Sequence, residues 1–224
     1  MRYENVVTGI FRKRPNRFTA WVDVDGAPQL CHVKNTGRCR ELLVDGATVY
    51  LEERCSDTRK TKFDLIAVEK GDRLINMDSQ APNKVAGEYL KTLFPDARYI
   101  KPEVKHGNSR FDFYLETEND KWFIEVKGVT LEDDGVVMFP DAPTERGLKH
   151  INELTACLDS GYKAMALFII QMKDVKYFTP NYMTHPQFGE ALKRAERAGV
   201  RLEAVDCIVT PDSLTAYESV AIRL

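Results

Sequence analysis

The stretch from residue 109 to residue 128 limits what this chain can fold into more than any other, because charged side chains stand there among strand-forming residues. Its sequence is SRFDFYLETENDKWFIEVKG. Aromatic and β-branched residues lie on both sides of the polar segment ETENDK, 116–121, whose composition is that of a turn. The stretch therefore predicts a β-hairpin with two carboxylates and a lysine in its strands.

The register of this hairpin decides which side chains share a face. Symmetry about the bond between Glu118 and Asn119 places Asp112 opposite Glu125, and it places Arg110 opposite Lys127. Successive residues of a strand point to opposite faces. The predicted charged face carries Arg110, Asp112, Tyr114, Phe123, Glu125 and Lys127, and the predicted apolar face carries Phe111, Phe113, Ile124 and Val126.

A facing aspartate and glutamate repel each other unless a cation lies between them. Mg²⁺ suits such a pair, because it takes one or two carboxylates and completes its coordination with water and substrate phosphates. Asp112 and Glu125 are therefore candidate catalytic residues and ligands of Mg²⁺ or Mn²⁺. Lys127 follows on the same face, where an ammonium can hold the attacking water or stabilise charge on a phosphoryl oxygen.

An Asp on one strand followed by Glu-x-Lys on the next resembles the PD-(D/E)XK nuclease superfamily. The short motif has an ordinary alternative, because Glu-x-Lys also occurs on exposed strands as a neutralised charge pair. Longer blocks are more specific: NTGR at 35–38, GNSRFDF at 107–113, EVKGVTL at 125–131 and FPDAPTERGLKH at 139–150. These blocks are similar to those of the sugar fermentation stimulation protein family, and the resemblance runs from near residue 10 to near residue 208.

The first part of the chain is predicted to be a small β-barrel. Short β-rich segments are separated by the turn signals Asp25-Gly26, Asp45-Gly46 and Gly71-Asp72, and no long helical pattern interrupts them. The expected strands cover residues 3–11, 17–23, 29–33, 48–52, 63–68 and 73–77. An OB-fold is the natural form of such a barrel, and the family resemblance implies the same. We therefore predict an OB-fold-like nucleic-acid-binding domain over residues 1–80.

Basic and aromatic residues are mixed over residues 11–18, FRKRPNRF, without an acidic residue. OB-folds hold single strands with aromatic platforms and basic grooves. The predicted nucleic-acid contacts of this segment are Arg12, Lys13, Arg14 and Arg17. The alternative is that Phe11 and Trp21 belong to the core and that the basic run is a solvated loop.

The NTGR block supports two interpretations. Gly37 can take a positive φ, and a turn of this kind exposes backbone N–H groups that, with Arg38 beside them, suit an anion such as phosphate. Alternatively, the block connects a strand to a short helix over 38–43 that Thr36 caps. On the family resemblance, we treat Asn35, Thr36, Gly37 and Arg38 as a candidate nucleic-acid-binding element.

Residues 81–224 are predicted to form a PD-(D/E)XK restriction-endonuclease-like α/β domain, so the chain belongs to the α/β (α+β) class. Helices are expected over 82–94, over 145–160 with Thr144 as N-cap, and over 186–198. The apolar run at 164–170 predicts a strand buried on both faces. The expected alternation of helix and strand predicts a sheet that is at least partly parallel.

Further polar residues surround the motif. In related nucleases a helix before the motif strands supplies another metal-facing acid, and Glu88 stands at the matching place; a surface charge is the alternative. His185 stands where the family is expected to carry Asp. Supporting candidates are Glu103, Ser109, Arg110, Glu145, Arg146, Lys149 and His150. Glu103 is either a third carboxylate or a partner for Arg110, and the charges at 145–150 also fit an ordinary solvated helix face.

Composition is that of a folded protein, with 43% hydrophobic and 29% charged residues. The net charge of −2 does not by itself indicate nucleic acid. No apolar run is long enough to span a bilayer and no signal peptide is evident, so we expect a cytoplasmic protein without membrane contact. The spacing of the five cysteines argues against a zinc site or a disulfide framework, although Cys39, between two arginines, is a candidate for a lowered pKa.

Three function classes remain. The first is a metal-dependent DNA nuclease, a phosphodiester hydrolase that binds single- or double-stranded DNA without sequence specificity. The second, implied by the family resemblance, is a non-enzymatic DNA-binding factor in transcription regulation linked to sugar (maltose) metabolism. The third is a small-molecule phosphohydrolase, for which neither a Walker loop nor a dinucleotide fingerprint is present. The oligomeric state is not indicated.

Overall fold

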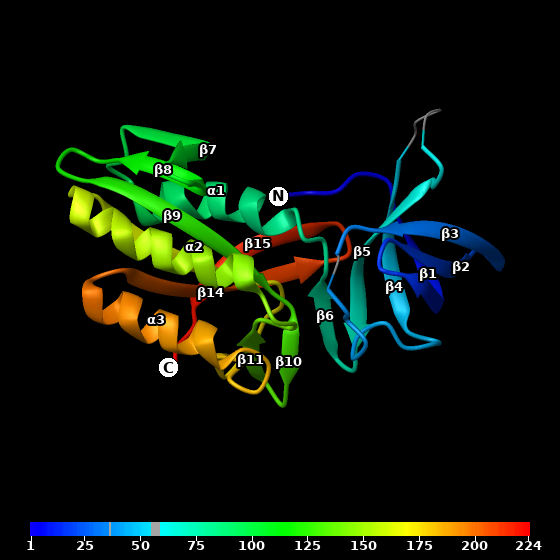
Figure 1. Ribbon diagram of the computed structural model, residues 1–224. Helices are drawn as coiled ribbons and strands as arrows, with labels where there is room; N and C mark the ends of the chain where they lie inside the picture. Colours follow the sequence, from blue (N-terminus) through cyan, green and yellow to red (C-terminus); the bar gives the residue numbers. More distant parts are fainter. Residues whose placement is uncertain (36, 55–58) are drawn as a thin grey trace.

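The structure is a computed structural model that describes residues 1–35, 37–54 and 59–224. Figure 1 shows two domains beside each other: an N-terminal β-barrel, drawn in blue to cyan, and a larger α/β domain that contains all the helices labelled there. The chain passes from the first domain to the second between β6 and α1. The N-terminus lies near the junction of the two domains (Figure 1).

The barrel is a six-stranded sheet in the order β3-β2-β1-β4-β5-β6, and a further pairing of β3 with β5 closes it. Its strands are β1 (Val6–Asn16), β2 (Thr19–Val24), β3 (Ala27–Val33), β4 (Thr48–Glu53), β5 (Phe63–Lys70) and β6 (Arg73–Asn76). Alternate residues of β2, Ala20, Val22 and Val24, point into the core, as a half-buried strand requires. The predicted OB-fold-like barrel is confirmed.

The first strand is longer than predicted. β1 continues through Asn16 with two irregularities in its pairing with β2, so most of the basic run lies on a strand and not in a loop. Phe11 is 2% exposed and belongs to the core, whereas Phe18 is 52% exposed. Phe11 is therefore a core residue, and Phe18 is the aromatic residue of this segment that faces solvent.

The second domain is built on a six-stranded sheet in the order β15-β14-β12-β9-β8-β7. Its strands are β7 (Tyr99–His106), β8 (Ser109–Glu116), β9 (Lys121–Val129), β12 (Lys163–Ile170), β14 (Arg201–Thr210) and β15 (Ser213–Ser219). The central strand β12 pairs in parallel with β9 and β14. Every residue of β12 after Lys163 is buried, as the apolar run predicts.

Helices cover both faces of this sheet (Figure 1). α1 (Ala81–Leu93) packs on one face with Met165, Leu167 and Ile169 of β12. α2 (Glu145–Ala156) and α3 (Pro186–Ala198) pack on the other face, where the alternate residues of β12 point. The sheet therefore has a separate apolar core on each face. Because successive strand residues point to opposite faces, alternate residues of β9 and β12 belong to different cores.

The helix ends follow the predicted signals. The Thr144 side chain accepts a hydrogen bond from the Gly147 amide at 3.0 Å, which confirms it as the N-cap of α2. The helix predicted to continue to residue 160 does so as a 3₁₀ turn, Cys157–Ser160, and Gly161 ends it with a φ of 80°. Gly199 ends α3 in the same left-handed conformation.

A small third sheet, β10-β11-β13, lies below the main one. It consists of β10 (Leu131–Asp133), β11 (Val136–Phe139) and β13 (Tyr177–Pro180). The predicted turn at 133–135 is present, with positive φ at Asp134 and Gly135. This sheet leads the chain from β9 to the FPDAP segment, so it sets where that segment lies.

A buried polar network joins the two domains. Lys34 of the barrel forms an ion pair with Asp78 at 2.5 Å, with side chains 7% and 3% exposed. Gln171, after β12, donates to the Asn76 side chain at 2.8 Å and to the Asp78 carbonyl at 3.1 Å. Since buried polar groups are costly unless they are paired, this network favours one relative placement of the domains.

The described cysteines Cys31, Cys39, Cys157 and Cys207 are free and buried, and Cys55 lies outside the described residues. Burial, followed by the charge of Glu41, raises the pKa of Cys39 to about 12. The expectation of a lowered pKa at Cys39 is therefore wrong, because desolvation outweighs the neighbouring arginines. Within the described ranges, no helix combines the length and apolar character needed to cross a membrane.

Candidate active site

β8 and β9 form the predicted hairpin in the predicted register. Their pairs run from Glu116 with Lys121 to Phe113 with Ile124. The ladder stops there, and Asp112 does not continue it: its Oδ2 accepts a hydrogen bond from the Val126 amide at 2.8 Å. β8 and β9 thus separate beside the motif residues, and the Asp112 side chain accepts the Val126 hydrogen bond in place of a backbone carbonyl.

The two faces of the hairpin are as predicted, with one exception. Phe123 packs in the core under α2, and Ile124 and Val126 pack in the core under α1. Phe111 was expected beside Phe113, but its ring lies 5.1 Å from that of Phe123, in the other core. That placement of Phe111 is therefore wrong, because β8 leaves the ladder between Phe111 and Phe113 and alternation no longer carries across.

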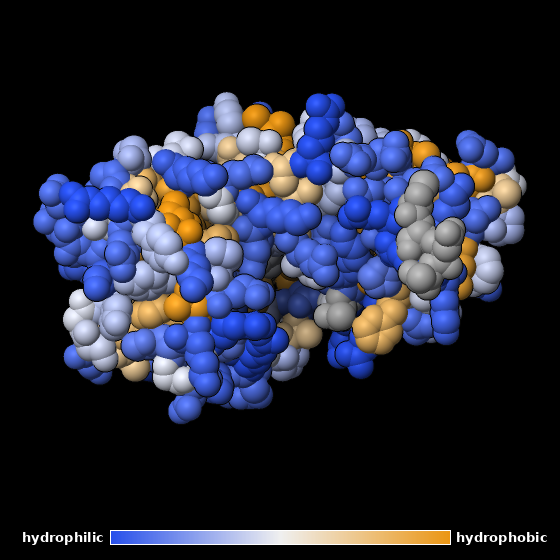
Figure 2. All heavy atoms as spheres, turned by 90° about the horizontal axis from the view of Figure 1, so that it is seen from above, coloured by the Kyte–Doolittle hydropathy of each residue, from blue (hydrophilic) through white to orange (hydrophobic). Residues whose placement is uncertain are grey.

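Asp112, Glu125 and Lys127 line one cavity of about 360 Å³. Figure 2 shows a mostly hydrophilic surface that is hollowed where the two domains meet. The cavity is lined by Ser79, Asn83, Glu103, Arg110, Phe111, Asp112, Glu125, Val126, Lys127, Phe139, Thr144, Arg146, Gly147 and His150. The structure therefore brings together the three motif residues and four of the supporting candidates named from the sequence.

Glu125 is the most enclosed member of the site, at 2% exposed. Its Oε1 contacts Lys127 Nζ and His150 Nδ1, each at 2.5 Å. Its Oε2 is buried and has no hydrogen-bond partner in the described part of the chain. A buried carboxylate oxygen without a partner is unfavourable, so this atom is a position for a cation or a water donor.

Asp112 is held from two sides, by the Val126 amide and by Asn83 of α1, whose side-chain amide donates to Oδ1 at 2.8 Å. Burial raises the pKa of Asp112, and the negative charge of Glu125 raises it further. The two hydrogen bonds and Lys127 oppose these effects without cancelling them. The positive charge and hydrogen bonds around Asp112 therefore do not fully stabilise its ionised form.

His150 has a larger part than the sequence suggested. It was one of the supporting candidates on the helix after the motif, yet it is buried and contacts Glu125. Its place on the stripe of Gly147, Ile151 and Leu154, which are all buried, is a signal that could have indicated this. Asn83 was missed altogether, and no sequence pattern marks it.

Some candidates lie elsewhere. Glu88, the candidate third metal ligand, is 57% exposed, pairs with the N-terminal amine at 2.7 Å and does not line the cavity. Lys149 pairs with Glu153 at 3.7 Å on the solvent side of α2. Glu145 is exposed, with Oε1 3.5 Å from Nε2 of His185. The structure does not bring Glu88 or Lys149 to the motif residues.

Three other candidates lie at the edge of the site. Glu103 and Arg110 line the cavity and approach each other to 3.7 Å, both well exposed, as expected if Glu103 is a partner for Arg110. Glu103 has a φ of 54°, an uncommon value for a residue with a side chain. Ser109 is buried, and within the described ranges its hydroxyl has no partner.

The basic residues of the barrel divide into two groups. Arg14 donates to four backbone carbonyls, those of Arg17, Asn35, Gly37 and Arg38, at 2.5–2.9 Å. Arg12 pairs with Asp23 at 2.7 Å. Arg12 and Arg14 therefore have structural partners. Lys13, Arg17 and Arg38 are exposed, and the last two line a basic concavity of about 480 Å³ with Arg14 and Arg40.

The NTGR block is neither of the predicted forms in full. The side chain of Asn35 accepts a hydrogen bond from the Gly37 amide at 2.8 Å, and turns rather than a helix follow at residues 38–43. Gly37 does not have a positive φ. A Cβ at residue 37 would collide with the Asp141 carboxylate and lie 2.9 Å from Asn35 Oδ1, so a larger residue there would require these two side-chain ends to shift. Thr36 lies outside the described residues.

Comparison with known proteins agrees with both domains. The family model described as SfsA N-terminal OB domain matches residues 13–77, and the model described as sugar fermentation stimulation protein RE domain matches residues 80–213. The chain belongs to the sugar fermentation stimulation protein family.

Relatives in this family cover the whole chain. It is 57% identical over 225 residues to a sugar fermentation stimulation protein homolog of Desulfitobacterium hafniense (strain DSM 10664 / DCB-2), covering 100% of this chain and 99% of the relative. Identity to the homolog of Clostridium beijerinckii is 55% over 226 residues, with 100% of both chains covered. A solved structure described as Pyrococcus furiosus SfsA in complex with Ca²⁺ matches with a TM-score of 0.89 and 27% identity, covering 100% of this chain and 98% of that one.

In this member of the sugar fermentation stimulation protein family, His185 stands at the N-cap of α3. It is 5% exposed, and its Nδ1 accepts a hydrogen bond from the Thr144 amide at 3.3 Å. A side chain on α3 thus fixes the first residues of α2, the helix that carries His150. An imidazole nitrogen performs there a task that a carboxylate oxygen can also perform.

Proposed function

We propose that this protein is a metal-dependent nuclease that hydrolyses phosphodiester bonds in DNA. The observation that carries the proposal is the partnerless Oε2 of Glu125, buried in the same cavity as Asp112 and Lys127. A neutralised surface pair, the ordinary alternative for Glu-x-Lys, would be exposed and satisfied. A purely DNA-binding role gives this oxygen no task.

The donors fit a hard divalent cation such as Mg²⁺ or Mn²⁺. Mg²⁺ prefers oxygen ligands and uses few carboxylates, and the described residues hold no cluster of three or more His, Cys, Asp or Glu side chains suited to a metal. Asp112 and Glu125 would be the protein ligands, Glu125 through Oε2. The Pyrococcus furiosus relative is described in complex with Ca²⁺, which also prefers oxygen, and this supports a cation site in the family.

When bound, the cation supplies positive charge that activates water and stabilises the phosphoryl oxygens. The protein's own residues hold the two carboxylates in position. His150 and Lys127 hold Oε1 of Glu125, so that Oε2 remains as the ligand atom, and Asn83 and the Val126 amide fix the Asp112 carboxylate. Lys127, 14% exposed, can donate to the attacking water or to a phosphoryl oxygen from the wall of the cavity.

The barrel would supply the DNA grip through its exposed cations. Lys13, Arg17 and Arg38 are exposed, and contacts of this kind to phosphates carry no sequence information. Arg12 and Arg14 act instead by holding the strand and the NTGR block in place. The barrel's contribution to binding is therefore expected to be sequence-independent and salt-dependent.

The experiment that tests the proposal measures cleavage of labelled single- and double-stranded DNA with Mg²⁺ or Mn²⁺. Asp112→Asn and Lys127→Ala should each reduce the rate by roughly 10²-fold or more, because the first weakens a ligand of the cation and the second removes a positive charge that stabilises the phosphoryl oxygens. Asp120→Asn and Lys121→Ala, from the turn of the same hairpin, are matched controls that keep wild-type rates. DNA binding is measured on the same samples and should persist in all variants.

Two outcomes would overturn the proposal. The first is a wild-type protein that binds DNA tightly and cleaves nothing with any divalent metal, which would favour the non-enzymatic DNA-binding factor. The second is cleavage that survives both motif substitutions, which would show that the activity comes from elsewhere.

A further inference from the structure

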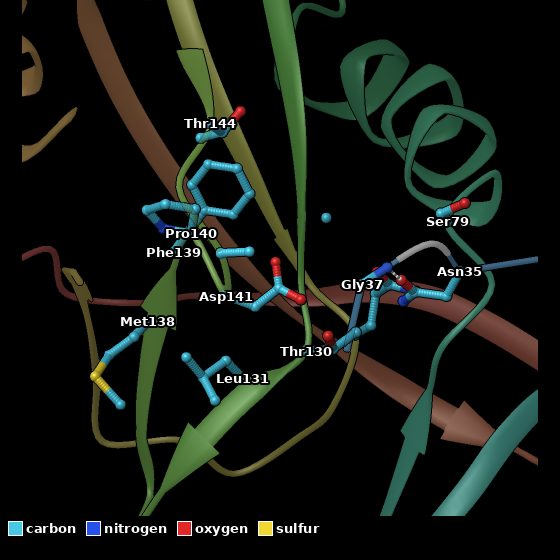
Figure 3. Close-up of a pocket in the computed structure, with 13 residues that line it drawn as sticks. Asn35, Gly37, Ser79, Thr130, Leu131, Met138, Phe139, Pro140, Asp141 and Thr144 are labelled. Carbon is cyan, nitrogen blue, oxygen red and sulfur yellow. Dashed lines mark hydrogen bonds between the residues drawn. The ribbon is translucent and has the colours of Figure 1, made fainter. Parts of the chain in front are cut away.

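Residues of two sequence blocks, Asn35 and Gly37 of NTGR and residues 139–142 of FPDAP, meet in one pocket (Figure 3). The pocket has a volume of about 260 Å³ and lies between the barrel and the α/β domain. Gly37 from the first block and Asp141 from the second lie so close that a Cβ at residue 37 would collide with the carboxylate. Without a Cβ at residue 37, the Asp141 carboxylate can lie directly against the backbone of Gly37.

This pocket adjoins the candidate active site. Ser79, Phe139 and Thr144 line both it and the cavity of Glu125. Gly37 and Ala142 line both it and the basic concavity on the barrel. A strand of nucleic acid that runs from the barrel's cations to the motif residues would therefore pass across this pocket.

The lining suits a flat, polar ring. Met138, Phe139 and Pro140 provide an apolar side, while Asn35 and Asp141 provide hydrogen-bonding groups. In Figure 3 the Asp141 carboxylate points between Phe139 and Gly37, toward the middle of the pocket. The volume is below the roughly 300–1,000 Å³ of sites for drug-sized ligands, so it suits one base better than a whole nucleotide. Stacking on an aromatic ring with polar contacts at the base edge is how unpaired bases are held.

We propose that this pocket binds one unpaired nucleobase of a single-stranded substrate, with the Asp141 carboxylate accepting hydrogen bonds from the base. A carboxylate only accepts, so it favours cytosine, whose exocyclic amino group donates, over thymine, whose one ring N–H lies between two carbonyl oxygens that repel a carboxylate. The base of a duplex cannot enter, because its edge is already paired and it is stacked on both sides. The claim that the adjoining phosphate is the one cleaved rests on the function proposed above.

The test measures the affinity of fluorescent oligo(dC) and oligo(dT) of equal length by anisotropy, with Ca²⁺ present. The wild type should bind oligo(dC) roughly tenfold more tightly, the effect expected of one hydrogen bond to a charged group. Asp141→Asn should bring the ratio of the two affinities close to one, because an amide can turn to donate or to accept. Gly37→Ala should do the same by displacing the carboxylate. Asp134→Asn, at the other end of the β10–β11 hairpin and 92% exposed, is the control that keeps the wild-type ratio.

Equal wild-type affinity for the two oligonucleotides, or a ratio that survives both pocket variants, would overturn the inference. Because the ratio is a binding measurement, it separates the two proposals. If the protein prefers oligo(dC) through Asp141 but never cleaves DNA, the base-pocket proposal is supported and the nuclease proposal is contradicted. If it cleaves DNA but binds the two oligonucleotides equally, the nuclease proposal is supported and the base-pocket proposal is contradicted.

Discussion

Two carboxylates on strands, the buried Asp64 in the barrel and the half-buried Asp112 in the α/β domain, have opposite surroundings. Asp64 is 4% exposed in its side chain and accepts hydrogen bonds from both terminal nitrogens of Arg59, with Arg54 at 3.6 Å and His32 at 3.2 Å. Burial acts to raise its pKa, but the hydrogen bonds and charge of Arg59 outweigh burial, and the pKa of Asp64 is lowered. Asp64 is therefore fully compensated by the protein's own cations.

Asp112 is not compensated in this way. Burial and then Glu125 raise its pKa, and the hydrogen bonds from Val126 and Asn83 do not reverse the shift. Its neighbour Glu125 shares one oxygen between Lys127 and His150 and leaves the other without a partner in the described part of the chain. The comparison teaches that a carboxylate with a structural task is surrounded by internal cations, whereas this pair leaves room for a cation from solution.

The largest effect expected from this comparison is on stability. Asp64→Ala should lower the free energy of unfolding by about 3 kcal/mol, because it leaves Arg59 without its buried partner. This is the low end of the range for broken buried pairs, since Arg59 is 30% exposed in its side chain and can rehydrate. The melting temperature should fall by roughly 6–12 °C, measured by differential scanning calorimetry.

The control for this measurement is Asp133→Ala, an exposed aspartate at the end of β10, which should have little effect. If Asp64→Ala lowers the free energy of unfolding no more than Asp133→Ala does, water solvates the cations around residue 64 as favourably as the Asp64 carboxylate does. The conclusion that the protein's own cations stabilise Asp64 would then be wrong.

The second prediction concerns added metal. Mg²⁺, Mn²⁺ or Ca²⁺ at about 100 times its dissociation constant should stabilise the wild type by roughly 2.7 kcal/mol. Glu125→Gln should remove most of this gain, because an amide is a weaker ligand than a carboxylate. The measurement is the melting temperature with and without metal, each against EDTA. Asp64→Ala serves as the control, since it should retain the full metal-induced rise; an equal rise in Glu125→Gln would place the cation elsewhere.

The smallest effect expected is a gain in stability. In metal-free protein, Asp112→Asn should slightly raise the free energy of unfolding, because a charged group in an unfavourable place becomes neutral. The amide oxygen can still accept from Val126, so the fold is kept. Urea unfolding in EDTA measures this, and a loss of stability would contradict the raised pKa of Asp112.

Acid should bring the variants and the wild type together, for opposite reasons. Asp64 has a lowered folded pKa, so its stabilisation is full above its unfolded pKa, near 4, and is lost as the pH falls through the folded value. Asp112 has a raised folded pKa, so the cost of its charge is full above that value and disappears as the pH falls to its unfolded pKa. The Asp112 difference from wild type should therefore shrink between neutral pH and about pH 4, whereas the Asp64 difference should persist down to about pH 4 and shrink only below it.

The sequence was most informative where one strand pair carries its own register. The turn at 116–121 and the alternation around it predict the pairing of Phe113 with Ile124, and they place Glu125 and Lys127 on the same face as Phe123. Prediction failed two residues beyond the ladder, at Phe111, because the Val126 amide bonds to the Asp112 side chain instead of to a backbone carbonyl. Alternation along a strand applies only while the ladder continues.

The basic segment shows a second limit. Composition grouped Arg12, Lys13, Arg14 and Arg17 together, yet Arg14 is occupied by four backbone carbonyls and Arg12 by Asp23. A guanidinium has five donors, so it serves equally well as a phosphate contact or as a brace for a loop. Only the position of the carbonyls of 35–38 distinguishes these uses, and no local pattern encodes that position.

By itself, the sequence determined the barrel, the α/β domain, the hairpin and the identity of the motif residues, because turn signals, alternation and strand-forming residues act over a few neighbouring positions. Tertiary structure alone decided that His150 contacts Glu125, that Glu88 turns away to the N-terminal amine, and that Gly37 lies against Asp141. These contacts join residues 25 to 104 positions apart in the chain. Their partners are chosen by how the two domains and the helices pack, which depends on the whole set of buried contacts and not on any one segment.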